Sequence, residues 1–173
     1  MTPGAYAVWG DGMKRDNSSV LSCALIVGGV VALCGVGVRI WCGSPYPGMM
    51  QMGVRALVPP VWLMSLLWTL WYFVLGAALG ALLRCFGQSC IGAWRGAFFF
   101  LLMLFAGFLW YPLFFIRQNL LCSLLSLLVT LACALMCALQ WQRVAAAAGI
   151  LMYLHVAWLT YLLILQLICL FGV

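Results

Sequence analysis

Charged side chains are scarce in this chain. Lysine, arginine, aspartate and glutamate together make up 6% of its 173 residues, whereas about 25% is usual in a soluble domain. A soluble protein of this length needs polar groups to cover its surface, and this sequence does not supply them. Hydrophobic residues make up 68% of the chain, and the mean hydropathy is +1.21. The composition therefore predicts an integral membrane protein embedded in a lipid bilayer.

Carboxylates are the rarest charged groups, and both of them, Asp11 and Asp16, lie near the N-terminus. Ion-coupled carriers usually place ionisable groups at membrane depth, so their absence from the apolar segments argues against carboxylate-coupled transport. Acid–base catalysis by paired carboxylates is excluded, and no serine or cysteine nucleophile is paired with a base. We therefore assign no catalytic residue, and whether the protein is an enzyme stays open.

Metal ligands are also few. His155 is the only histidine, and the nine cysteines include no C-x-x-C pair. Most of the cysteines lie inside apolar runs, where a thiol behaves as a small hydrophobic group. The sequence thus predicts no metal site and no required cofactor.

Five apolar stretches are long enough to cross a bilayer as helices, which takes about 20 residues each. They cover residues 19–41, 61–83, 94–115, 120–140 and 144–171. The predicted fold is an all-α integral membrane protein, a bundle of five transmembrane helices forming one domain over residues 19–173. Residues 1–18 form a short polar tail, residues 42–60 form a long proline-bearing connection, and residues 117–119 and 141–143 form tight turns.

The basic residues are scattered singly between these stretches, although the formal net charge is +6. A nucleic-acid-binding protein would gather them on one face, so this class is excluded. The side that holds the N-terminus collects five of them and the other side three. The five are Lys14, Arg15, Arg84, Arg95 and Arg143, and the three are Arg39, Arg55 and Arg117. This excess predicts a cytoplasmic N-terminus.

Small residues recur at four-residue spacing on two of the predicted helices. Ala24, Gly28 and Ala32 form one such stripe, and Gly76 and Gly80 form a GxxxG motif. Small side chains allow helix backbones to approach closely in lipid. Packing inside the chain is the favoured interpretation, and a homodimer is the alternative.

Tryptophans fall into two groups by depth. Those near segment ends, typical of the membrane interface, are Trp41, Trp62, Trp94 and Trp141. Trp68, Trp110 and Trp158 lie deeper, in the half of the bilayer next to the long connection, and Gln166 lies two turns after Trp158. Inward-facing rings at one depth would suit a flat apolar ligand, with the amide to orient it. The alternative is that these rings only fill the bundle or face lipid.

His155 lies one turn before Trp158 and shares roughly the same helix face. The favoured interpretation is a neutral imidazole bonded to a carbonyl group of a neighbouring helix. The alternative is a ligand contact, either to a carboxylate or to the iron of a metalloporphyrin.

Three segments resemble signatures of the TspO/MBR family, the tryptophan-rich sensory proteins and mitochondrial translocator (peripheral benzodiazepine receptor) proteins. Pro59-Pro60-Val61-Trp62, followed by Trp68-Thr69, Tyr72, Gly76 and Ala78, resembles "PPxW…WTxLYxxxGxA". Trp110 with Phe114-Phe115 resembles "NxxWxxxFF", and Trp158 with Gln166 resembles "PYxxWxxxxxxxN". The chain departs from these patterns at Gly107, which replaces the asparagine, at Leu154-His155, which replace Pro-Tyr, and at Gln166. The family's cholesterol-recognition stretch is absent.

The resemblance implies a five-helix protein, often dimeric, that binds porphyrins and related ligands in a pocket under the connection between the first two helices. The predicted ligand-binding residues are Trp68, Tyr72, Trp110, Phe114, His155, Trp158 and Gln166. The resulting hypothesis is a membrane receptor or carrier for porphyrin-like or haem-like molecules. One alternative is a light-dependent porphyrin-degrading enzyme that uses Trp68 and Trp158. Others are a structural or regulatory protein that binds partners through its glycine faces, and a transporter of small solutes.

Overall fold

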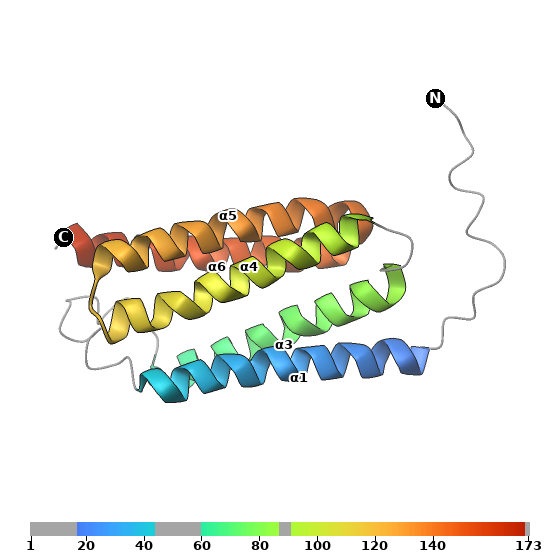
Figure 1. Cartoon of the computed structure of the whole chain (residues 1–173), viewed down its shortest axis with the longest axis horizontal. Helices are drawn as coiled ribbons and strands as arrows, with labels where there is room; N and C mark the ends of the chain where they lie inside the picture. The colour runs from blue at the N-terminus through green and yellow to red at the C-terminus, as the bar shows by residue number, and fades with distance from the viewer. Residues whose placement is uncertain (1–16, 44–59, 87–90, 172–173) are drawn as a thin grey trace, which may run out of the picture.

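A computed structural model describes residues 17–43, 60–86 and 91–171, and every regular element within these ranges is an α-helix. The helices are α1 (Asn17–Cys42), α3 (Val61–Phe86), α4 (Ile91–Phe115), α5 (Leu120–Val144) and α6 (Ala146–Phe171) (Figure 1). Each contains a stretch that is long and apolar enough to cross a membrane. The predicted all-α bundle of five spanning helices is therefore confirmed. Nearly all of the predicted tail and of the long connection lies outside the described residues.

Helix α5 is longer than its apolar pattern predicts. Residues 141–143, expected to form a turn, are helical, and α5 continues to Val144. Only Ala145 separates α5 from α6. Its backbone is extended (φ −151°, ψ 115°), and its N–H donates to the Trp141 carbonyl at 2.8 Å. The prediction of a turn is wrong because glutamine and arginine are good helix formers, so the helix continues where the apolar run ends.

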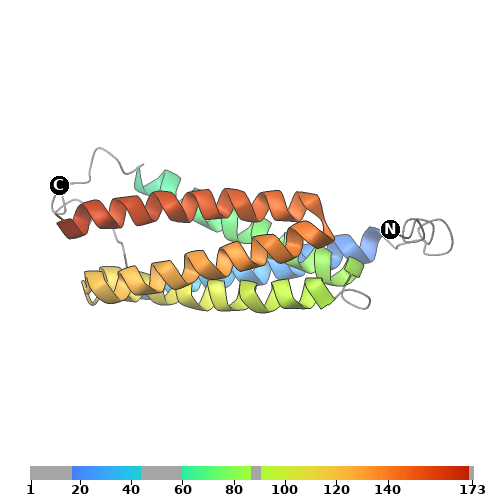
Figure 2. The same cartoon turned by 90° about the horizontal axis from the view of Figure 1, so that it is seen from above.

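The helices form two groups. Figures 1 and 2 show α1 and α3 lying side by side, with α4, α5 and α6 together as a second group. Helix α1 packs chiefly on α3, and α5 packs on both α4 and α6. The two groups meet where α3 faces α4 and α6 and where α1 faces α4.

Glycines bring α1 and α3 into close contact. A Cβ atom at Gly76 would lie 2.9 Å from the Val27 carbonyl oxygen, and one at Gly80 would lie 2.6 Å from that of Cys23. On α1, a Cβ atom at Gly28 would lie 2.8 Å from a carbonyl oxygen of α3. No side chain larger than hydrogen fits at these positions without movement of the helices. The small-residue stripes therefore serve packing inside the chain.

Large rings fill the space between the two groups. Trp68 of α3 contacts Tyr111 of α4 and Trp158 of α6, each with ring centroids 6.0 Å apart. Tyr72 of α3 contacts Phe108 of α4 at 5.3 Å. We call these five rings the aromatic seam. The seam holds α3 to the other group through side chains, whereas α1 and α3 touch through their backbones.

The outward faces of the helices are apolar. Exposed large side chains occur along every helix, for example Leu25, Ile26, Leu33, Leu70, Phe98, Phe105, Leu121, Leu125, Ile150 and Ile164. Trp41, Trp62 and Trp94 are exposed near helix ends, where an amphipathic ring suits the membrane interface. A surface of this kind matches lipid as the surrounding solvent.

We expect Gly80→Ala to destabilise the protein by about 1–3 kcal/mol, the usual cost of overpacking, because the new methyl group would press on the Cys23 carbonyl. Gly29→Ala is the matched control, since nothing lies within 4 Å of an added Cβ atom there, and alanine favours helix by about 0.5–1 kcal/mol over glycine. Unfolding by SDS in mixed micelles measures both variants. Equal stability of the two would contradict close packing through Gly80.

Candidate functional site

Trp68 lies at the centre of the aromatic seam. Its ring contacts Tyr72 one turn further along α3, with centroids 5.5 Å apart. It also makes edge-on contacts with Tyr111 and Trp158, both at 6.0 Å. Edge-on and tilted arrangements are the favourable ones for aromatic pairs. Trp68 thus joins three helices at one point.

A groove with a volume of about 460 Å³ runs between α3 and α6. It is lined by Leu67, Trp68, Trp71, Leu154, Ala157, Trp158 and Tyr161. Leu67 and Leu154 at its edges are exposed, so the groove opens to the outside of the bundle. Its walls are almost entirely apolar and aromatic, and its size is within the range of small-molecule sites.

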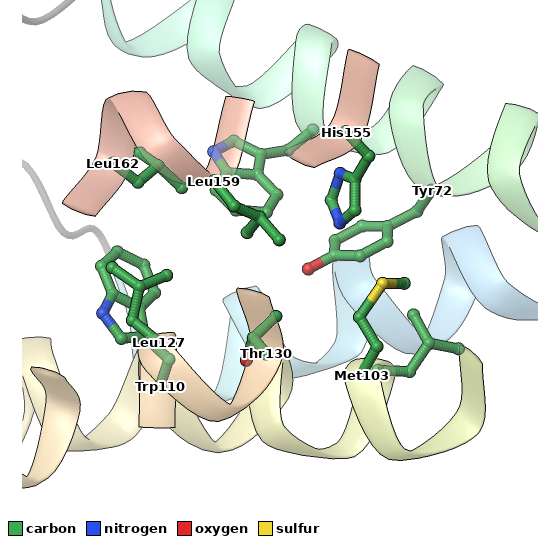
Figure 3. Close-up of a pocket in the computed structure, with 11 residues that line it drawn as sticks. Tyr72, Met103, Trp110, Leu127, Thr130, His155, Leu159 and Leu162 are labelled. Atoms are coloured by element: carbon green, nitrogen blue, oxygen red, sulfur yellow. The ribbon is translucent and has the colours of Figure 1, made fainter. Parts of the chain in front are cut away.

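A separate cavity lies inside the bundle and has a volume of only about 10 Å³, room for one water molecule. It is lined by Trp68, Tyr72, Met103, Leu104, Gly107, Trp110, Leu127, Thr130, His155, Leu159 and Leu162 (Figure 3). We call it the core cavity. Trp68 lines both the groove and the core cavity, so its ring lies between the two.

His155 is almost fully buried, with 2% of its surface exposed. Its Nδ1 accepts a hydrogen bond of 2.6 Å from the indole N–H of Trp71 on α3. We expected a helix carbonyl as the partner of this imidazole. This expectation is wrong, because the partner is the indole N–H of Trp71, a donor. Sequence reasoning did not single out Trp71. Its place three residues after Trp68, on a neighbouring part of the same helix face, was the signal that could have identified it.

Trp110 and Gln166 meet in a buried hydrogen-bond network. The indole N–H of Trp110 donates to Oε1 of Gln166 at 2.8 Å. The Gln166 amide nitrogen donates to the Ser123 hydroxyl at 2.6 Å and to the Leu120 carbonyl at 3.1 Å. Both amide hydrogens are therefore used within the protein, and the network ties α4 and α6 to the start of α5. Gln166 lines neither the groove nor the core cavity.

Phe114 supports this network and lines neither space. Its ring stacks on that of Trp110, with centroids 5.1 Å apart and planes at 21°. Both side chains are buried. Their role as direct ligand contacts stays a prediction.

The three deep tryptophans converge but do not line one common space. Trp68 and Trp158 share the groove, whereas Trp68 and Trp110 share the core cavity. Trp158 is half-buried and faces the groove, and Trp110 is 5% exposed inside the bundle. The predicted cover over the site, residues 42–60, falls almost wholly outside the described residues.

Trp141 lies near the end of α5, but its ring is not exposed as that of an interfacial tryptophan would be. Its ring is fully buried, stacks on Phe100 at 5.4 Å and presses against Gly96, where a larger residue would collide with it. The ring is buried because this face of α5 packs on α4, where Phe100 and Gly96 lie against it. Of the nitrogen and oxygen atoms of the described side chains, its indole nitrogen is the one that is fully enclosed and has no hydrogen-bond partner.

Within the described parts of the chain, no group of three or more histidine, cysteine or acidic side chains could hold a metal ion. The seven cysteines described there, among them Cys133 and Cys137, are free thiols.

We expect Trp110→Phe to destabilise the protein by about 1 kcal/mol, a usual size for an interhelical hydrogen bond in a membrane bundle. The substitution keeps a ring in place but leaves Oε1 of Gln166 without its donor. Trp158→Phe, at a half-buried ring outside the network, is the matched control. SDS unfolding compares them, and a double-mutant cycle with Gln166→Leu gives the coupling. A coupling free energy of zero would show that the bond contributes nothing.

Comparison with known proteins gives one family. The TspO/MBR family profile matches residues 30–170, which include the second half of α1 and almost all of the four helices that follow. No curated protein and no solved structure matches the chain significantly. The match covers the aromatic seam, the groove and the core cavity. This chain therefore belongs to the TspO/MBR family and is a multi-pass integral membrane protein.

Proposed function

We propose that this protein is a membrane receptor or carrier that binds a flat, hydrophobic, porphyrin-like ligand in the groove between α3 and α6. The observation that carries the proposal is the wall of this groove, where Trp68, Trp71 and Trp158 lie together with Tyr161. Indole faces are large, rigid and apolar, and they stack on planar conjugated rings.

The position of the groove suits a ligand that arrives from the lipid. Its edges carry exposed leucines of two membrane-spanning helices, so a hydrophobic molecule can enter from the side without crossing water. The core cavity is too small for such a ligand. In this proposal Trp110, Phe114 and Gln166 act behind the site, because their contacts fix the positions of α4, α5 and α6.

The rival hypothesis of partner binding through the glycine faces has less support. Gly76 and Gly80 lie against the backbone of α1 in the same chain, so a partner would have to displace α1 to reach them. The groove, in contrast, is lined by the exposed side chains of Leu67 and Leu154, so a ligand can reach it without displacing a helix.

We expect Trp158→Ala to weaken the binding of protoporphyrin IX about fivefold to thirtyfold, because a stacked ring pair contributes about 1–2 kcal/mol with its buried area. Trp68→Ala should have an effect of similar size. Titration of the purified protein, followed by the porphyrin absorption band, measures the affinity without depending on the number of tryptophans.

Trp41→Ala is the control for this titration, because its ring is 74% exposed at the end of α1 and takes no part in the groove. The proposed site would be wrong if Trp68→Ala and Trp158→Ala both bound the porphyrin as tightly as Trp41→Ala does.

Porphyrin degradation is a second candidate, favoured by the contact between Trp68 and Trp158. Both rings line the groove and their centroids are 6.0 Å apart, so one bound porphyrin would reach both. Light-dependent loss of the porphyrin that disappears in a Trp68→Phe/Trp158→Phe variant would support this activity. Equal loss with and without these tryptophans would leave binding as the function.

A further inference from the structure

The hydrogen bond between Trp71 and His155 fixes which nitrogen of the imidazole carries its proton. An indole N–H can only donate, so Nδ1 of His155, which accepts from it at 2.6 Å, must offer a lone pair. In the neutral ring the proton is then on Nε2. His155 thus presents an N–H donor on its other side.

The tautomer that carries its proton on Nε2 cannot bind a metal through Nε2, because that nitrogen has no free lone pair. Histidines that ligate metals through Nε2 donate their Nδ1–H to a partner, and here the partner of Nδ1 is itself a donor. Of the two contacts weighed for this histidine, the one to an acceptor oxygen fits the geometry and the one to a metalloporphyrin iron does not.

The core cavity holds the other polar groups near this donor. Figure 3 shows the Tyr72 hydroxyl pointing toward the middle of the group formed by His155, Thr130 and Leu159. Tyr72 is 8% exposed and His155 2%, and neither the hydroxyl nor Nε2 forms a hydrogen bond with any residue that the structure describes. Thr130 donates its hydroxyl hydrogen to the Ser126 carbonyl at 2.8 Å and keeps lone pairs free to accept.

Gly107 keeps this space open. A Cβ atom there would lie 3.6 Å from the Thr130 methyl group and 4.0 Å from the Tyr72 hydroxyl oxygen, so a longer side chain would extend between them. In the family signatures quoted above, Gly107 stands at the asparagine, His155 at the tyrosine and Trp71 at a leucine. Three departures from the pattern thus meet at one place. In this chain the imidazole of His155, which Trp71 orients, lines the cavity that Gly107 leaves open.

We propose that the core cavity is a subsite for one acceptor oxygen and that His155 Nε2–H is its donor. In the free protein a water molecule supplies the oxygen. In the complex, a carbonyl or carboxylate oxygen of the ligand in the adjacent groove replaces the water when the Trp68 ring turns aside. The second part rests on the proposed function, whereas the donor itself does not.

The donor can be tested without any ligand, because His155 is the only histidine in the chain. In protein labelled with 15N-histidine, the two ring nitrogens give well-separated signals that identify the protonated one. We expect the Nε2–H form in the natural sequence and a mixture of both forms in Trp71→Phe. A predominant Nδ1–H form in the natural sequence would overturn the proposal.

The ligand half of the proposal, in which a ligand oxygen replaces the water, is tested with two porphyrins. Protoporphyrin IX carries carboxylates, whereas etioporphyrin has only alkyl groups. The quantity measured is the ratio of the affinity for protoporphyrin IX to that for etioporphyrin, which we call the preference. We expect this preference to fall about threefold to tenfold in His155→Phe, as for the loss of one hydrogen bond. Gly107→Leu, which fills the cavity, should lower the preference as well, and Trp41→Ala should leave it unchanged.

The outcomes separate the two proposals. If both porphyrins bind but His155→Phe keeps the full preference, and the 15Nε2 signal does not move on binding, the subsite holds water only and its ligand role is wrong. If neither porphyrin binds the natural sequence, the proposed function fails, and with it the ligand half of this inference. A haem spectrum showing axial nitrogen ligation that is lost in His155→Phe would overturn the assigned donor.

Discussion

Lipid offers no hydrogen bonds, so a buried N–H of this bundle can be satisfied only by a partner inside the chain. Two indole N–H groups have such a partner on another helix: Trp71 donates to His155, and Trp110 donates to Gln166. Each bond sets the rotation of two helices about their axes, because the ring and its acceptor must face one another. The position of the groove and of the core cavity follows from these rotations. Trp141, whose nitrogen has no partner among the described residues, is held by ring stacking and close packing instead.

The bundle contains two kinds of helix interface, one formed by backbone contact and one formed by large side chains. Between α1 and α3, glycines let the backbones touch, which leaves no room for a ligand. Between α3 and α6, large rings keep the backbones apart, and these rings form both the wall of a groove and the lining of a cavity. Of these two interfaces, only the one between α3 and α6 therefore has space for a small molecule.

Sequence reasoning predicted the family, the five helices and the nearness of Trp68 to Trp158, because composition, segment length and motif spacing determine these features. It did not predict that Trp141 is buried or that Trp71 is the partner of His155. The helices are apolar on nearly every side, so hydrophobic periodicity does not distinguish the inward face from the face toward lipid. Those assignments depend on the rotation of each helix, which only the packed structure gives.

The single residue between α5 and α6 has a mechanical consequence. Ala145 is too short a link to let the two helices separate, and Gly149 of α6 lies against Gln142 of α5, where an added Cβ atom would come within 2.7 Å. Helix α6 must therefore move together with α5. The α6 wall of the groove is therefore tied to α5, whereas the α3 wall is tied to α1 through the close contacts at Gly28, Gly76 and Gly80.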